Sequence, residues 1–580
     1  MTMRWALCVL ALATGPTFAA DPAWKTATTP NYRIISQVSD LDTADWMRGF
    51  DEFVLATSTK LGISPHALPP LTVVIFARAK DFTPYKVLRP NGKTANVAGQ
   101  FSWRPTWSVI AMAHDAFDDQ SRRTIYHEAT HWLMSVDQSS QPAWFSEGIA
   151  EMFSTFEHRG GKVNWAKPID EHLQLLGTTP LMPLAQFLAE DSALFDGDDR
   201  TNLFYAQAWA FTHFLLFSKD QERRRMLAKF LNAYKTQSGE ATVKAVFGKD
   251  LPDIEREFRG YATQRTWSYM IEPAQPVTPP PPLQPASAEL VEASLGILAL
   301  GSEKADLARQ HAQKAIDLDP AAPEGHAILA YLARTADGVD TDAGVAQAEA
   351  AVQRGSRDAE MFRMLGDSYV NGPNTSKPNA AAASIGMYEN AINSSPRQVA
   401  YFERLVEALL SFEKPREDDA KFLSVGLRLF PGDDWLRVGS AVVDDRLGRH
   451  DSAVTELEAA LRPDSRLNPA QRDYAEQVRS RWLLETMRSE ISVAQNNRDY
   501  SGARAILARY RDRLARSPQT DMYLKDTDDR LAVFEGLSRY DALLHDGKIA
   551  EARALAQQLL ANPDLPGAMR GHLQGTHLGK

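Results

Sequence analysis

The stretch His127-Glu128-Ala129-Thr130-His131 decides how the first half of this chain folds and what chemistry it can carry. Residues four apart lie on one face of an α-helix, so the two imidazoles can point at the same ion. Histidine is a common zinc ligand, and Glu128 can take a proton from a water molecule at that ion. The H-E-x-x-H pattern therefore predicts a zinc-dependent hydrolase. The alternative is an amphipathic helix with two surface histidines.

The residues around this motif favour a helix. Asp118 and Ser121 precede it and offer an N-cap and polar groups for the first turn. Ile125, Trp132 and Leu133 place apolar side chains on the same turns. The segment is thus expected to be a helix with one buried face.

A second stretch supplies a third ligand. Sixteen residues after His131, the sequence W-F-S-E-G-I-A-E begins a predicted helix that starts near Pro142. Glu147 can complete a three-residue zinc site, and Glu151, one turn later, can hydrogen-bond the far nitrogen of a ligand histidine. The alternative is two glutamates on a solvated face. That alternative leaves Gly148, a helix-weakening residue, unexplained.

These two segments together resemble the gluzincin metallopeptidases. The nearest variant is the peptidase-MA-like group, which is similar to the aminopeptidase N superfamily and often found in secreted bacterial proteins. The resemblance spans roughly residues 30–270. It implies Zn²⁺ on His127, His131 and Glu147, with Glu128 as the general base.

The composition sets the class of protein. The chain has 580 residues, is 44% hydrophobic and 24% charged, and carries a net charge of −10. These values are ordinary for a globular protein of several domains. No basic stripe stands out, so no nucleic-acid partner is expected. No later stretch is long and apolar enough to predict a membrane span.

The first twenty residues predict an export signal. Arg4 precedes a short apolar run that Gly15-Pro16 interrupts, and small residues follow at Ala19 and Ala20. The protein is therefore expected to be periplasmic or secreted. The single cysteine, Cys8, lies inside this signal. A mature chain without cysteine has no disulfides and no thiolate zinc ligands, so any zinc must be held by histidine, carboxylate and water.

A mixed α/β region precedes the motif. Strands are predicted at residues 31–38 and 71–76, a helix at 43–61, and a hairpin from residues 97–103 and 107–113. In gluzincins the strand before the zinc helix lies at the sheet edge and pairs with substrate, which implies that role for residues 107–113. A plain structural strand is the alternative. The stretch from Val109 to Asp115 lacks the glutamate motif of the aminopeptidases, which favours an endopeptidase.

A donor for the reaction's oxyanion is expected downstream, where residues 160–270 read as mostly helical. Related gluzincins use a tyrosine there, and Tyr205 is our first candidate, with His213 second. Core packing of Tyr205 is the alternative.

A proline-rich segment, residues 273–287, is predicted to be an extended spacer; a ligand for another protein is the alternative. Beyond it, small residues recur with the spacing of tetratricopeptide (TPR) repeats, a resemblance that is degenerate and irregular. The sets are Ala308, Ala312 and Ala315; Ala453, Leu457 and Ala460; Ala503, Leu507 and Tyr510; and Ala552, Ala556 and Leu559. A non-repetitive helical domain is the alternative.

The expected architecture is an α+β gluzincin-like catalytic domain, with a small N-terminal β-sheet and zinc-binding helices, followed by an all-α TPR-like solenoid. The boundaries are residues 1–20 for the signal, 21–272 for the catalytic domain, 273–287 for the linker and 288–580 for the repeats. The first hypothesis is a zinc metallopeptidase that acts on a peptide or protein substrate, with repeats that recruit substrate or partner. The second is a catalytically weak or inactive protein-binding scaffold that acts through the TPR-like repeats.

Overall fold

The computed structural model describes residues 23–64, 70–87, 99–104, 106–135, 142–189, 198–234, 239–335, 337–412, 414–514, 517–563 and 565–577. The predicted signal, residues 1–20, lies outside them. The chain forms two compact units, Met1–Tyr401 and Phe402–Lys580. The first unit holds two sheets, the helices of the predicted site and the first helix pairs of the array. Over its described residues, the second unit consists of helices joined by turns and loops.

A six-stranded sheet organises the first unit, in the order β4-β5-β3-β2-β1-β9. Strands β2, β3 and β5 run parallel, while β1, β4 and β9 pair antiparallel with their neighbours. The strands are β1 Lys25–Thr28, β2 Tyr32–Ser36, β3 Leu71–Phe76, β4 Gly99–Trp103, β5 Ser108–Ala113 and β9 Gln284–Pro285. The predicted strand at 71–76 is confirmed, and the one predicted at 31–38 is shorter, Tyr32–Ser36. The hairpin is confirmed over its described residues, and residues 97, 98 and 105 lie outside them.

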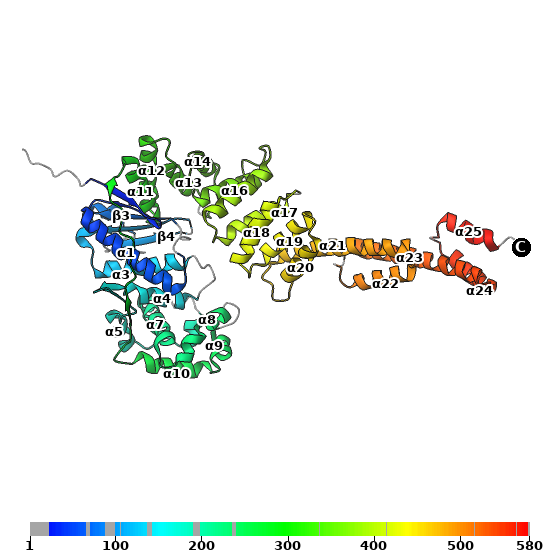
Figure 1. The fold of residues 1–580 in the computed structure, drawn as a ribbon, viewed down its shortest axis with the longest axis horizontal. Helices are drawn as coiled ribbons and strands as arrows, with labels where there is room; N and C mark the ends of the chain where they lie inside the picture. Colours follow the sequence, from blue (N-terminus) through cyan, green and yellow to red (C-terminus); the bar gives the residue numbers. More distant parts are fainter. Residues whose placement is uncertain are drawn as a thin grey trace, which may run out of the picture. The chain divides into compact units, whose positions relative to one another are not determined.

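Both faces of this sheet are covered, because successive side chains of a strand point to opposite faces. Val73 and Ile75 pack with α1, Asp40–Leu61, and α3, Asp119–Met134. Val74 and Phe76 pack on the other face with α11, Ala288–Gly301, and α12, Ala305–Leu318. Figure 1 shows the sheet between these two helical layers. The helix predicted at residues 43–61 is therefore confirmed as α1 and begins three residues earlier.

A helical layer lies below α3 in Figure 1 and carries the rest of the predicted site. Helix α4 packs on both α3 and α7. A second small sheet, in the order β6-β7-β8, follows α4 in sequence. The elements are α2 Ala79–Phe82, α4 Ala143–Ser154, β6 Glu157–Arg159, β7 Lys162–Trp165, α5 Asp170–Thr178, α6 Leu184–Ala189, α7 Asp198–Phe217, α8 Gln221–Tyr234, α9 Gly239–Phe247, α10 Leu251–Ala262 and β8 Met270–Pro273, with single 3-10 turns at Thr83–Tyr85 and His114–Ala116.

The proline-rich segment is tied to the first unit at both ends, which a free spacer is not. Strand β8 pairs with β7, and Gln284 and Pro285 pair with Thr26 and Lys25 of β1. The compact unit therefore continues past the predicted linker as far as Tyr401. The physical reason is that α11 buries Val291, Leu295 and Leu298 directly on the sheet.

The helices after this segment form a TPR-like array of antiparallel pairs. In the first unit α11 packs on α12, α13 on α14 and α15 on α16. Ala308, Ala312 and Ala315, predicted as repeat positions, are buried in α12. The predicted inserted loop at residues 371–379 separates α15 from α16. The helices are α13 Glu324–Leu332, α14 Asp342–Gln353, α15 Ala359–Asn371, α16 Ala380–Ser394 and α17 Val399–Leu410.

In the second unit the small residues again lie where helices meet. The predicted sets at 453–460 and 503–510 are buried in α20 and α22. In the third set, Ala552 and Ala556 are buried in α24, and Leu559 is partly buried. The turn glycines Gly448 and Gly547 have φ values of 82° and 73°, which L-residues rarely adopt. The remaining helices are α18 Glu417–Leu429, α19 Asp434–Arg446, α20 His450–Ala460, α21 Pro469–Asn496, α22 Tyr500–Arg511, α23 Pro518–His545, α24 Ile549–Leu560 and α25 Gly567–His577.

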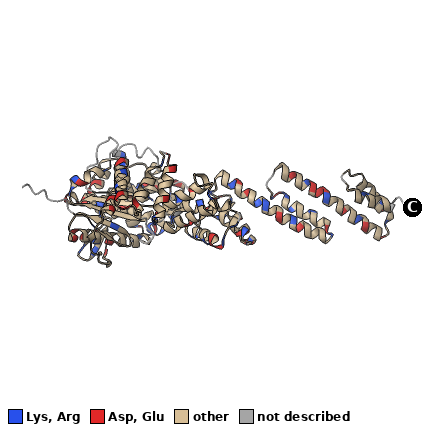
Figure 2. Ribbon diagram, turned by 90° about the horizontal axis from the view of Figure 1, so that it is seen from above, with Lys and Arg blue, Asp and Glu red and all other residues tan. Residues whose placement is uncertain are grey.

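Charge is mixed along these helices. Figure 2 shows Lys and Arg side by side with Asp and Glu on the helices of both units. Among the described residues, no helix has an apolar stretch of the length that a bilayer crossing requires.

Candidate metal centre

Helix α3 carries the two histidines of the motif. Its N-cap is Asp118, whose side chain accepts a hydrogen bond from the backbone N–H of Ser121, as predicted. Ile125, Ala129 and Leu133 are buried in the core between this helix and the sheet. The burial of that face fixes the rotation of the helix about its axis. His127 and His131 therefore point together toward α4.

Helix α4 brings Glu147 to the histidines through a close approach to α7. A Cβ atom built on Gly148 would lie 2.4 Å from the carbonyl oxygen of Ala208 and 2.2 Å from the hydroxyl of Thr212. Only glycine fits at such distances. Gly148 is thus the residue that lets α4 seat against α7, which explains a helix-weakening residue beside the predicted ligand.

The three predicted ligands meet. The Nε2 atoms of His127 and His131 are 3.2 Å apart, and Glu147 Oε2 lies 3.2 Å from the first and 3.3 Å from the second. Two atoms that bind zinc at about 2.0–2.1 Å in tetrahedral geometry are about 3.3 Å from each other. The spacing of this donor set therefore suits a zinc ion.

The outer nitrogens of the histidines have partners of their own. His127 Nδ1 lies 3.2 Å from Glu151 Oε1, and His131 Nδ1 lies 3.1 Å from the hydroxyl of Ser146. An ionised carboxylate can only accept a hydrogen bond, so the protonated Nδ1 of His127 donates one to Glu151. In neutral His127 the Nε2 atom then carries a lone pair. The predicted position of Glu151 behind a ligand histidine agrees with this contact.

Lone pairs thus converge at the centre of the site. Nε2 of His127 and a carboxylate oxygen face one another and face Nε2 of His131 within 3.3 Å. The lone pairs of these three atoms repel one another unless a cation, either a proton or a metal ion, lies between them. The donor types, two imidazoles and a carboxylate, are those of catalytic zinc sites with one open position.

The pKa values of the residues at the centre are shifted by their close contacts. Burial lowers the pKa of His127, but hydrogen bonds with Glu147 and Glu151 outweigh it and raise this pKa to about 10. Burial raises the pKa of Glu147, but its hydrogen bonds with both histidines outweigh it and lower this pKa to about 2. Burial raises the pKa of Glu128, the predicted general base. A raised carboxyl pKa suits a group that must accept and return a proton near neutral pH.

The two oxyanion candidates differ in their surroundings. The ring centroid of Tyr205, on α7, lies 6.1 Å from that of His127. Burial and the charge of Glu147 raise the pKa of Tyr205, so its hydroxyl keeps its proton and can donate. His213 is fully buried, with Nδ1 2.8 Å from the hydroxyl of Tyr261 and Nε2 2.7 Å from the carbonyl of Ser268. Both of its nitrogens are engaged in the core.

Two residues of the site were not predicted. Ser146 contacts His131, and His172 on α5 lies 3.2 Å from Glu151 Oε2. Glu151 therefore bridges two histidines. The sequence spacing of His172 does not identify it as a residue of the site, because its position depends on how α5 packs on α7. Ser146 directly precedes the predicted ligand, and its hydroxyl was the one available signal.

The sheet edge is not where the sequence predicted it. Residues 107–113 were expected to form the outermost strand, but β5 lies between β4 and β3, and all six of its residues are buried. Over the described residues β4 is the outermost strand on that side. The physical reason is the hairpin itself, since β4 pairs antiparallel with β5 and covers it. Strand β4 also packs against α3, the helix of the motif.

One family model matches part of the chain that carries the site. Residues 121–238 match a family described as "Protein of unknown function (DUF1570)". This match begins six residues before His127 and includes Glu147, Glu151 and Tyr205, but it covers only about a fifth of the chain. No curated protein matches.

Among solved structures, matches include a MamA protein, a thermophilic TPR protein of Thermus thermophilus and PilF of Pseudomonas aeruginosa. Their sequence identities are 15%, 18% and 16%. They cover 31%, 32% and 41% of this chain, and 98%, 97% and 97% of their own, with TM-scores of 0.22, 0.20 and 0.22. Likenesses at these scores carry no argument about activity. None of these proteins is named as a peptidase.

Proposed function

We propose that this protein is a zinc-dependent metallopeptidase, with Zn²⁺ held by His127, His131 and Glu147. The observation that carries the proposal is the meeting of three lone-pair atoms within 3.3 Å, next to the half-buried Glu128. The gluzincin resemblance of the two helices points to the same chemistry. An exported protein that cleaves peptides within the chain, with its helix pairs recruiting substrate or partner, is the fuller form of this proposal.

The residues have separate tasks in this mechanism. Bound zinc would polarise the peptide carbonyl and acidify water in the open position. Glu128 would take the proton from that water and pass it to the leaving amine. The Tyr205 hydroxyl would donate a hydrogen bond to the negative oxygen that develops. Glu151 and Ser146 would hold the two imidazoles in the orientation that presents Nε2.

The test is a Glu128→Ala variant assayed on a peptide library. We expect hydrolysis to fall by about 10²–10⁴-fold, because the proton acceptor is gone, while zinc content measured by atomic absorption stays at the wild-type level. Glu240→Ala, an exposed glutamate at the start of α9, is the matched control and should cleave normally. Hydrolysis at the wild-type rate in the Glu128 variant would reject the mechanism.

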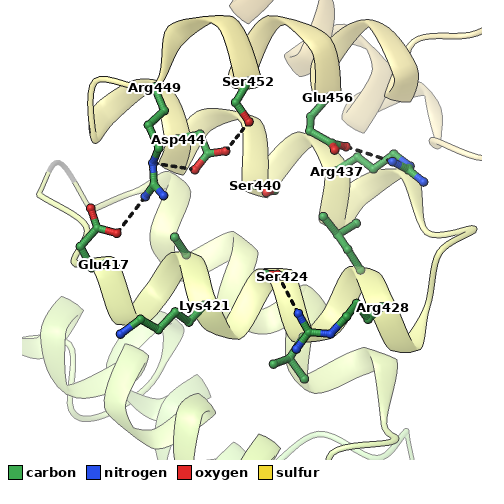
Figure 3. A pocket seen from close by; sticks show the side chains of 13 residues that line it. Glu417, Lys421, Ser424, Arg428, Arg437, Ser440, Asp444, Arg449, Ser452 and Glu456 are labelled. Carbon is green, nitrogen blue, oxygen red and sulfur yellow. Dashed lines mark hydrogen bonds and ion pairs between the residues drawn. The ribbon is translucent and has the colours of Figure 1, made fainter.

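A protein-binding scaffold that acts through the helix pairs is the second candidate. A cavity of about 760 Å³ opens among α18, α19 and α20. Figure 3 shows its charged walls, where Arg437 pairs with Glu456 at 2.9 Å and Arg449 lies between Asp444 and Glu417 at 3.2 and 3.1 Å. Such a polar groove suits a protein partner.

Cleavage assays with and without a chelator separate the two candidates. Chelator-sensitive cleavage supports the peptidase. No cleavage in either condition, together with a partner retained by residues 290–580, supports the scaffold.

A further inference from the structure

A cavity of about 400 Å³ opens beside the candidate metal centre, between α4, α5 and α7. Its polar lining comes from Glu151, Glu171, His172, Gln174, Thr178, Asn202 and Tyr205. This volume lies within the range of small-molecule and side-chain pockets. The cavity is therefore large enough to receive one long side chain.

Two residues connect the cavity to the centre. Glu151 lines it and also contacts His127 Nδ1 at 3.2 Å. Tyr205 lines it and packs its ring edge-on against the ring of His127. The cavity thus lies beside His127, one of the predicted ligands.

The lining favours a positively charged occupant. Glu171 is a carboxylate at the opening, and Gln174 and Asn202 add amide oxygens that can accept hydrogen bonds. Both oxygens of Glu151 already contact histidines, His127 and His172. Among the described residues that line the cavity, none is Lys or Arg. Arg123 lies 3.4 Å from Glu171, and Glu171 itself is 71% exposed. Solvent screens that exposed pair, which leaves Glu171 able to exchange partners.

We infer that this cavity is a substrate subsite for a Lys or Arg side chain next to the scissile bond. The inference rests on the proposed peptidase function for its meaning, but the binding preference itself can be measured without turnover. Glu171 would set the preference, because it is the carboxylate at the opening. Gln174 and Asn202 would supply the remaining acceptors.

The experiment measures binding to the zinc-loaded, full-length Glu128→Gln protein. Fluorescent hexapeptides that differ only in one central residue, Lys, Gln or Glu, are titrated by anisotropy. We expect the Lys peptide to bind about 5–10-fold more tightly than the Glu peptide. Glu171→Lys should abolish or reverse that order, and Glu171→Asp should keep it.

Glu240→Lys is the control, because it makes the same change in net charge on an exposed helix outside the cavity. Equal binding of the three peptides, no binding of any of them, or equal effects of Glu171→Lys and Glu240→Lys would overturn the subsite. Cleavage by the wild-type protein is assayed in parallel. Preferential binding of the Lys peptide without cleavage would reject the peptidase function and support the subsite. Cleavage without preferential binding would support the peptidase function and reject the subsite.

Discussion

At the scale of single residues, the candidate centre depends on Glu151 as much as on the three ligands. Its two oxygens contact His127 and His172, both at 3.2 Å. Burial raises the pKa of Glu151, but hydrogen bonds with these histidines outweigh it and hold the pKa well below its usual range. The carboxylate therefore stays charged and keeps the proton of His127 on Nδ1.

We predict that Glu151→Gln weakens zinc binding by about 10–100-fold, since partners behind a ligand histidine tune metal affinity by that amount. Competition with a chromophoric chelator measures it. Ser146→Ala, which removes a neutral partner of His131, should cost less. Unchanged affinity in the Glu151 variant would show that the carboxylate does not orient His127.

His213 gives the fold a pH dependence that is separate from the centre. Burial lowers its pKa from 6.5 to about 4, and Nε2 donates to the carbonyl of Ser268 while Nδ1 accepts from Tyr261. The folded state thus holds neutral histidine, and the unfolded state binds more protons below pH 6.5. Its contribution to stability is complete above pH 6.5 and is lost as the pH falls toward 4.

We predict that this histidine lowers the free energy of unfolding by about 3 kcal/mol between pH 6.5 and pH 4. Denaturant melts of the wild type and of His213→Gln at several pH values isolate the effect as the difference between the two curves. A difference that does not change with pH would mean that His213 is not held neutral.

At the scale of elements, the contact between α4 and α7 positions Glu147, the proposed third ligand. Gly148→Ala would push a methyl group into the Ala208 carbonyl, so we predict a loss of about 1–3 kcal/mol in stability and a weaker zinc site. Thermal melts and zinc titration measure both.

Gly177→Ala in α5 is the control for this variant. A Cβ at Gly177 meets nothing within 4 Å, so alanine there should be neutral or stabilising, as alanine is in most helices. If both substitutions changed stability and zinc binding equally, the close approach of α4 to α7 would not be needed for the site.

The elements that could be predicted from sequence are those whose signal is local. Residues 71–76 form β3 as predicted, Asp118 caps α3, and Gly148 was recognised as anomalous. The position of β5 inside the sheet could not be predicted, because strand order depends on which neighbour pairs with which. His172 was missed for the same reason, since its contact with Glu151 comes from the packing of α5 alone.

At the scale of the whole molecule, the sheet needs helices from beyond the proline-rich segment. Ile35, Val74 and Phe76 are buried in one cluster with residues of α11 and α12. We predict that a chain ending at Pro285 exposes this face, binds a hydrophobic dye and aggregates, because large uncovered apolar surfaces associate. A chain ending at Tyr401, the limit of the compact unit, should stay soluble and melt cooperatively.

Light scattering and dye fluorescence on the two shortened chains measure this difference. Equal solubility of both would show that the sheet does not depend on the helix pairs. Retention of zinc by the chain ending at Tyr401 would further show that the centre is complete within the first unit, where all its ligands lie.

The pairing of β9 with β1 has a consequence for how the protein is made on the ribosome. Strand β1 can pair with β9 only after Gln284 and Pro285 have been synthesised. The second face of the sheet is fully covered only after Ile328 has been synthesised. At about 5–20 residues per second, the interval from Ala113 to Ile328 lasts on the order of 10–40 s. During that time the apolar face of the sheet in the nascent chain is exposed and prone to aggregation. A chaperone that shields this face would raise the yield of native molecules.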